Sequence, residues 1–452
     1  MAHRKAGADA ATGRGTARSA ERDRAAGAGA FVRGGGLGRL CGAAAVSRFG
    51  DALRGMALPL LAYALTDSPL LISLVTACGF VPWLLFGLLG GAVADRVDQR
   101  RAMWAVDVLR GLLMAGFALA VALDRVGIGL LLALSFALTT LQTLFDNAAT
   151  ALLPAVVPQE ELGRANARLM TCQEVAGRFI GGPLAPVLLA LGAALPFLAD
   201  AATYFLAAAL VASLRTGPPA ARPAVAGRTL RHDIADGIRQ LWRDRVLRAF
   251  CLSVALANIG LGALVATLVV VVKSWLGAGD FGYAAVTTGY GIGMVLGGLL
   301  ARRAIAAAGG GGPALLIAGA LQTVVLAGLG TLRSPAAAAV FLGLFGFASM
   351  VVNVLETTVV QQRSPAGMLG RVSAAFRTVS VAGTPLGALL GGVAAGVYGP
   401  RSPALLAAAL LALGTVALIP VLQAPDSTWS GGGQLPSPSL GFARVGGAPT
   451  AR

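Results

Sequence analysis

The sequence predicts an all-α integral membrane protein with twelve transmembrane helices in two six-helix halves. Three observations support this fold class: the composition, the number of long apolar runs and an internal repeat. Of the 452 residues, 56% are hydrophobic and 12% are charged, and the mean hydropathy is +0.76. A soluble globule of this size needs more polar surface than that. The composition therefore excludes a large soluble catalytic domain.

Twelve apolar runs are long enough to cross a bilayer, for which a helix needs about 20 apolar residues. In order, the runs are 40–65, 69–94, 102–122, 126–150, 166–190, 193–213, 249–274, 281–305, 313–332, 335–360, 371–397 and 402–422. They divide the chain into a disordered basic arm (1–37), one half (38–213), a linker (214–248), a second half (249–422) and a disordered tail (423–452). In the linker, apolar residues at helical spacing predict an amphipathic helix on the inner membrane face, with a plain solvated linker as the alternative.

Arginines decide the orientation, because cytoplasmic loops accumulate positive charge. One side of the membrane holds the arm, the linker and several loop arginines, namely Arg96, Arg100, Arg101, Arg164, Arg168, Arg302, Arg303, Arg363 and Arg371. The opposite loops hold little beyond Arg125, Lys273, Arg333 and Arg401. Both termini are therefore predicted to be cytoplasmic. The net charge of +16 reflects topology and attraction to anionic lipid, and we expect no nucleic-acid partner.

An internal repeat relates the two halves. A shift of 207 positions places Gly90 to Arg96 on Gly297 to Arg303, and Pro158 with its following Leu-Gly-Arg on Pro365 with the same triplet. The same shift places Asp51 of the first run on Asn258 of the seventh. A repeat of this kind predicts a substrate path between the halves, near the bilayer midplane.

These segments carry a family resemblance. Gly91-Ala-Val-Ala-Asp95-Arg96-Val-Asp98-Gln-Arg100-Arg101 resembles the loop 2–3 signature of the major facilitator superfamily, with Asp98 where glycine is usual. Further matches are Ser47 to Asp51, Leu162 to Asn166, Gly182-Pro183, Asp236 to Arg239, Gly370-Arg371-Val372 and Pro385-Leu386-Gly387. Together they resemble the exporter branch that contains enterobactin exporters and macrolide efflux proteins.

The resemblance implies a monomeric secondary transporter of the cell membrane that exports a small organic molecule, driven by a proton gradient and without a bound cofactor or metal. An importer or uniporter of a metabolite is the alternative. It also implies a conformational latch in which Asp95 faces the N-terminal end of the eleventh helix, supported by Gly91, Arg96, Arg100 and Arg101. A loop whose arginines act only as a topology signal is the competing interpretation of that segment.

Ionisable residues within the runs are candidate sites, because a charge in the bilayer costs several kcal/mol unless it is paired or hydrated. The candidates for proton coupling or the substrate cavity are Arg48, Asp51, Arg54, Gln142, Asp146, Glu174, Arg178, Asn258, Asn353, Glu356 and Arg377. Asp51 and Glu174 lead as coupling acids. The branch's F-x-P-A motif is here Phe145-Asp146-Asn147-Ala148, so Asp146 is a local addition and a candidate for substrate contact. Mutual salt bridges that hold the helices together are the competing interpretation. Asp107, Arg110 and Asp200 are expected to be structural, since their helices are peripheral in the family fold.

Small residues and prolines predict close helix packing at Gly177, Gly181, Gly182, Pro183, Pro385 and Gly387. An embedded enzyme is the main alternative of another class, yet both histidines, His3 and His232, lie outside the runs. No nucleotide-binding P-loop sequence is present, so ATP is not expected to drive transport. A non-transporting scaffold would require the intramembrane charges to be dispensable. We therefore expect a transporter and no enzyme activity.

Overall fold

The fold is described by a computed structural model that covers residues 36–94, 98–156, 165, 168–169, 171–173, 175–214, 230–365 and 368–422. The first set of helices is α2 (Gly36–Leu65), α3 (Pro69–Ala94), α4 (Gln99–Ala122), α5 (Ile128–Val156), the π-helix η2 (Val175–Gly181), α7 (Gly182–Leu191) and α8 (Leu195–Ala212). The second set is α9 (Leu230–Arg243), α10 (Arg245–Val270), the π-helix η3 (Val271–Trp275), α11 (Asp280–Ala307), α12 (Gly311–Thr331), α13 (Pro335–Arg363), α14 (Leu369–Val381), α15 (Gly383–Tyr398) and α16 (Ser402–Leu422). The predicted tail and almost all of the predicted arm lie outside these residues.

Ten helical segments in this part of the chain are long and apolar enough to cross a membrane. Two more helices, α2 and α3, have 30 and 26 residues. Helix α2 differs from the ten because Arg48, Asp51 and Arg54 stand in its middle. The chain is thus an all-helical membrane protein, and the count of twelve spans stays a prediction.

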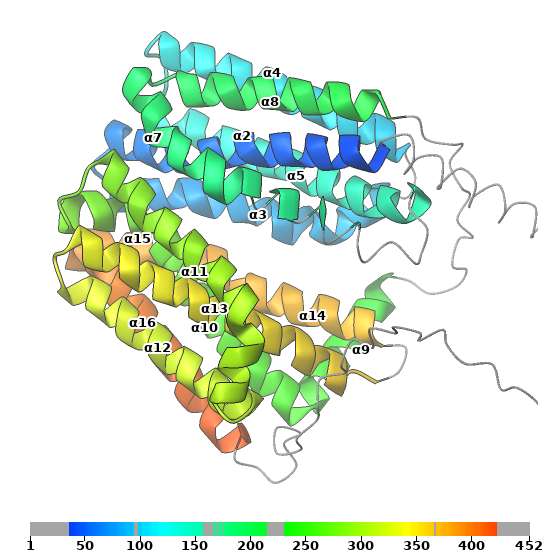
Figure 1. Ribbon diagram of the computed structural model, residues 1–452, viewed down its shortest axis with the longest axis vertical. Helices are drawn as coiled ribbons and strands as arrows, with labels where there is room; N and C mark the ends of the chain where they lie inside the picture. Colours follow the sequence, from blue (N-terminus) through cyan, green and yellow to red (C-terminus); the bar gives the residue numbers. More distant parts are fainter. Residues whose placement is uncertain are drawn as a thin grey trace, which may run out of the picture.

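The helices form two groups that touch at one end (Figure 1). Helices α2 to α8 make one group and α10 to α16 the other, and the ribbons diverge toward the end where α2 and α14 begin. At the closed end the Tyr63 hydroxyl lies 3.0 Å from Ser274 Oγ, and Lys273 Nζ lies 5.3 Å from the centroid of the Tyr63 ring. The Met56 sulfur accepts a hydrogen bond from Thr287 at 3.5 Å. These contacts join the two groups where α2 ends and α11 begins.

The amphipathic linker helix α9 packs against α14, and Gly237 allows the close approach. A Cβ at Gly237 would lie 2.5 Å from the Arg371 carbonyl oxygen. Asp244 follows α9 and caps α10, accepting hydrogen bonds from the Val246 and Leu247 amides at 2.8 and 3.0 Å. The same carboxylate pairs with Arg363 of α13 at 3.1 Å. The linker helix is therefore attached to the second group.

Glycines at the contact between α10 and α15 let the two backbones meet, and this supports a stability prediction. A Cβ at Gly387 would overlap the Ile259 carbonyl group, a backbone atom that cannot rotate away. Gly387→Ala is expected to lower the free energy of unfolding by about 1–3 kcal/mol. Gly396→Ala in the same helix is the control, because a Cβ there meets no atom within 4 Å. Thermal unfolding of both purified variants checks this, and equal midpoints would contradict it.

Candidate functional site

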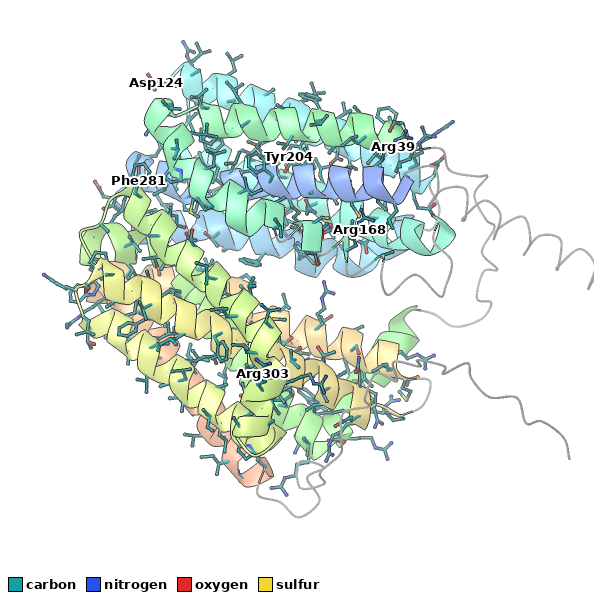
Figure 2. The ribbon with its side chains drawn as sticks, viewed as in Figure 1. Arg39, Asp124, Arg168, Tyr204, Phe281 and Arg303 are labelled. Carbon is teal, nitrogen blue, oxygen red and sulfur yellow. The ribbon has the colours of Figure 1, made fainter. Side chains whose placement is uncertain are left out.

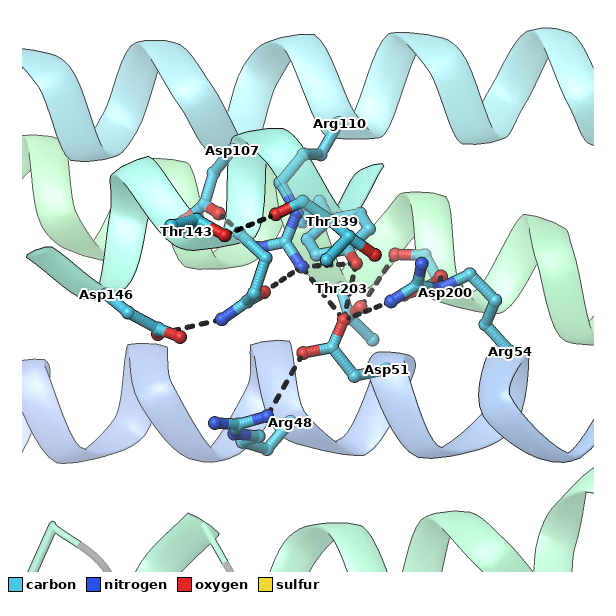
Figure 3. Close-up of polar contacts among 12 residues, drawn as sticks. Arg48, Asp51, Arg54, Asp107, Arg110, Thr139, Thr143, Asp146, Asp200 and Thr203 are labelled. Atoms are coloured by element: carbon cyan, nitrogen blue, oxygen red, sulfur yellow. Dashed lines mark hydrogen bonds and ion pairs between the residues drawn. The ribbon is translucent and has the colours of Figure 1, made fainter. Parts of the chain in front are cut away.

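A cluster of charged side chains lies at the centre of the first helix group and is organised around Asp51 (Figure 3). Asp51 Oδ1 accepts hydrogen bonds from Arg54 at 2.8 Å, from Arg110 at 2.9 Å and from the Tyr204 hydroxyl at 2.6 Å. Its other oxygen, Oδ2, lies 4.0 Å from Arg48 Nη1. The spacing of three residues places Arg48, Asp51 and Arg54 on one face of α2. Asp51 therefore connects its own helix to α4 and α8.

Arg110 of α4 lies at the centre of this cluster and has no exposed side-chain surface. Besides Asp51, its guanidinium group contacts Asp107 at 3.3 Å, the Tyr204 hydroxyl at 2.6 Å and the Gln142 side-chain oxygen. These contacts reach three other elements of the chain, namely α2, α5 and α8. A buried guanidinium group needs such acceptors, since an unpaired charge in this environment is very costly.

Two further acids complete the cluster. Asp200 of α8 has no exposed side-chain surface and pairs with Arg54 Nε at 3.3 Å. Asp146 of α5 accepts a hydrogen bond from Gln142 Nε2 at 2.8 Å, and Gln142 joins it to Arg110. The prediction that Gln142 and Asp146 share a site with Asp51 thus has a geometric basis. The structure places all of these side chains between α2, α4, α5 and α8.

Acidic and basic side chains gather in this cluster. Among the described residues, three guanidinium groups, on Arg48, Arg54 and Arg110, lie with four carboxyl groups, on Asp51, Asp107, Asp146 and Asp200. Glu174 and the side chain of Arg178 are not among the described residues. An ionised carboxyl group at this depth of a membrane protein is expensive unless it is paired or hydrated, so these acids are candidates for binding a proton.

Asp51 also faces a cavity of about 520 Å³ between the two helix groups. Arg48, Asp51 and Gln173 line it from the first group, beside Gly177 and Gly182. The second group contributes residues of α10, α11 and α13, namely Leu261, Leu264, Val265, Leu268, Tyr283, Thr287, Thr288, Tyr290, Gly291, Leu342 and Phe345. The cavity is therefore lined by charged groups from the first group and by aromatic and apolar groups from the second.

The predicted residues of the second half lie apart from this cluster. Asn258 donates a hydrogen bond to the Ser380 carbonyl group at 2.9 Å, which joins α10 to α14. Asn353 is exposed and Glu356 is half-buried on α13. Arg377 is exposed on α14, with its guanidinium carbon 5.4 Å from the centroid of the Trp83 ring. No ion pair joins Glu356 to Arg377 in the part of the chain that the structure describes.

Two of the predicted packing residues, Gly181 and Gly387, lie where backbones of neighbouring helices approach closely. A Cβ at Gly177 would lie 3.4 Å from the Arg48 carbonyl oxygen, and one at Gly181 would lie 2.7 Å from the Phe49 carbonyl oxygen. Gly182 faces Met56. Pro183 begins α7 next to a second cavity, and Pro385 is buried at the start of α15.

Several predicted residues fall outside the described residues. Asp95, Arg96 and Glu174 are among them, and the side chain of Arg178 and the surroundings of Gly91 are likewise not described. At the predicted latch, Arg100 donates to the carbonyl groups of Val211 and Ala212, and Arg101 pairs with Asp98 at 3.7 Å. The latch and the pairing of Glu174 with Arg178 stay predictions.

Sequence reasoning missed the participation of Asp107, Arg110, Asp200 and Tyr204. The sequence assigns Asp107, Arg110 and Asp200 a structural role on peripheral helices, which stays a prediction; their side chains point from α4 and α8 toward α2 and lie in the cluster with Asp51. A signal was available: Asp107 and Arg110 repeat the three-residue spacing of the α2 charges. Among the described residues, no group of three or more histidine, cysteine or acidic side chains could hold a metal ion.

Comparison with known proteins identifies the family of this fold. The family model described as Major Facilitator Superfamily matches residues 40–388. The chain is 28% identical over 380 residues to the enterobactin exporter EntS of Shigella boydii serotype 4, covering 82% of this chain and 88% of that protein.

Two solved structures share the fold at low sequence identity. The nucleoside transporter NupG aligns with a TM-score of 0.69 and 12% identity over 85% of this chain and 99% of that one. A bacterial homologue of the iron transporter ferroportin, in an inward-facing state, aligns with a TM-score of 0.64 and 14% identity over 86% and 98% of the two chains.

Proposed function

The chain belongs to the major facilitator superfamily of membrane transporters, and from this membership we propose that it exports a small organic molecule in exchange for protons. Its twelve helices would work as two six-helix halves in alternating access. The similarity to an enterobactin exporter supports the direction of transport. The single observation that carries proton exchange is the cluster of three arginines and four aspartates beside the cavity between the halves.

The conformation described above is the inward-facing one in this proposal. The helix groups touch where Tyr63 meets Ser274, and they diverge at the end that carries α9 and the beginning of α14 (Figure 1). That second end is rich in arginine, including Arg239, Arg243 and Arg371, which favours the cytoplasm under the positive-inside rule. Substrate would then enter the cavity from the cytoplasm or from the inner part of the bilayer.

Asp51 couples substrate binding to proton binding, because it takes part in both. Its carboxyl group lines the cavity, and it accepts hydrogen bonds from Arg54, Arg110 and Tyr204. When the cavity opens to the outside, a proton that enters the cluster neutralises one of its carboxyl groups. Inward opening would release that proton and restore the charge. The two states thus differ in how strongly the cavity binds its substrate.

The proposal predicts that transport needs a proton gradient and no direct supply of ATP. Efflux of a panel of small organic molecules is measured from cells that lack their own pumps and express this chain. A protonophore is expected to reduce efflux to the level of cells without the protein, because the gradient supplies all of the driving force. Efflux that survives the protonophore and stops on removal of ATP would refute the proposal.

A further inference from the structure

Two arginines meet one tryptophan ring at the closed end of the second helix group. The guanidinium carbon of Arg333, in the turn after α12, lies 4.2 Å from the centroid of the Trp275 ring. The guanidinium carbon of Arg401, in the turn before α16, lies 5.7 Å from the same centroid. None of the three residues is among those that line the two cavities described above. Segments far apart in the sequence thus bring two positive charges together outside the transport path.

The two arginines are unpaired among the described residues, which include every helix-to-helix turn at this end of the bundle. Within that part of the chain, neither Arg333 nor Arg401 makes an ion pair or a hydrogen bond. Lys273 differs, because it pairs with Asp280 at 2.5 Å; Figure 2 shows Phe281, the residue after Asp280, at this end of α11. Contact with a ring uses the face of a guanidinium group, so its N–H donors stay available to an anion.

The tryptophan also has an unused donor. Its indole Nε1 is buried and has no hydrogen-bond partner in the part of the chain that the structure describes. A buried donor without an acceptor is destabilising. The site therefore combines two guanidinium groups with a third group that favours an acceptor, and an oxygen anion is the class of ligand that suits all three.

The site lies at the level of lipid headgroups. Three candidate membrane spans have Trp275, Thr331 and Ser402 as their terminal residues at this end. Trp275 and both arginines therefore stand at one boundary of the apolar layer, where tryptophan is enriched. In the orientation proposed above this is the outer boundary, whose turns carry few basic residues. Two of those few thus share one ring.

The surface next to the arginines is apolar along α12 and α16. The two helices approach closely there, since a Cβ at Gly330 would lie 2.7 Å from the Leu405 side chain. Val324 of α12 and Val416 of α16 are 66% and 60% exposed, and Leu332 is 51% exposed. Exposed apolar side chains on a membrane span contact lipid tails. An anion held at this site therefore has hydrocarbon beside it, which favours a phospholipid over free phosphate.

We propose that Arg333, Arg401 and Trp275 bind the phosphate group of an anionic phospholipid whose acyl chains lie along α12 and α16. The two guanidinium groups donate charge-assisted hydrogen bonds to the phosphate oxygens. The N-terminal end of α16, beside Arg401, adds a partial positive charge. A zwitterionic lipid binds less well, because the arginines repel the cation of its headgroup. The site goes beyond the proposed function, since lipid binding here needs neither protons nor substrate.

Native mass spectrometry of the full chain in detergent tests the site. Dioleoylphosphatidylglycerol and dioleoylphosphatidylcholine are each titrated against the native chain and against the double variant Arg333→Gln, Arg401→Gln. Both side chains are exposed, so the variant is expected to fold. The double change is expected to weaken binding of phosphatidylglycerol about tenfold and binding of phosphatidylcholine less than about twofold.

Arg125→Gln is the matched control for Arg333→Gln alone. Arg125 is exposed and follows Asp124, which Figure 2 places at the same end of the molecule in the first helix group. Arg333→Gln is expected to weaken phosphatidylglycerol binding about threefold, and Arg125→Gln is expected to leave it unchanged.

Three results would overturn the inference. The first is a native chain that does not prefer phosphatidylglycerol to phosphatidylcholine. The second is an equal loss of phosphatidylglycerol binding in Arg125→Gln and Arg333→Gln, which would show a general effect of charge. The third is displacement of the lipid by an equal concentration of inorganic phosphate, which would show that the ligand is free phosphate.

Discussion

Replacing Arg110 with methionine is expected to destabilise the protein so that little folded protein is found in the membrane. The change leaves Asp51, Asp107, Tyr204 and Gln142 without their shared donor, and it removes one positive charge from the cluster. Removing one partner of a buried ion pair costs about 3–5 kcal/mol. That is a large part of the roughly 5–15 kcal/mol that stabilises a typical protein. The amount of monodisperse protein after detergent extraction measures the effect.

Two further variants serve as controls for the Arg110→Met result. Arg101→Met removes an arginine of the same helix that is 82% exposed, and it is expected to leave the yield unchanged. Asp107→Asn added to Arg110→Met removes one negative charge in compensation and is expected to recover part of the yield. A normal yield from Arg110→Met alone would show that the cluster does not hold the helices together.

Asp51→Asn is expected to abolish concentrative export while leaving downhill exchange in place. Asparagine keeps an oxygen that accepts hydrogen bonds from Arg54, Arg110 and Tyr204, so the helices stay connected. The change removes the carboxyl group to which the proposal assigns the coupling proton, so no proton is carried. Export against a gradient should fall at least about tenfold, because coupling is lost and binding is not. Uphill and downhill fluxes in proteoliposomes measure the two effects separately.

The control for this variant is Asp124→Asn, in the turn between α4 and α5. Asp124 has a φ of 53°, a conformation that asparagine also adopts readily, and it lies outside the cluster. Both fluxes are expected to match those of the native chain. Concentrative export that persists in Asp51→Asn would place the coupling proton on another acid.

The fold could be predicted in detail from hydropathy. The runs 69–94 and 402–422 coincide with α3 and α16, because each begins at a turn with proline or serine and stays apolar to its end. The run 126–150 stops before Pro154, whereas α5 continues to Val156, since proline is tolerated in membrane helices. The run 166–190 corresponds to the single candidate span Thr171–Leu191, within which η2 is followed by α7. A hydropathy pattern has no signal for a π-helix, which depends on local backbone hydrogen bonds.

The candidate site could be predicted only within single helices. Arg48, Asp51 and Arg54 stand three residues apart, so their meeting follows from helix geometry alone. The link from Asp51 to Tyr204 spans 153 positions of the chain and depends on how α2 packs against α8. Depth in the membrane was the available clue, because Arg110, Gln142 and Tyr204 all fall near the middle of their runs. Depth does not tell which face of a helix points inward.

The central claim is that Asp51 binds the coupling proton and releases it when the cavity opens inward. Infrared difference spectra of the protein in lipid between low and high pH test it through the carbonyl band of a protonated carboxyl group. The account predicts that such a band appears on acidification of the native chain and is lost in Asp51→Asn. A native spectrum without the band, or a band that is unchanged in Asp51→Asn, would contradict it.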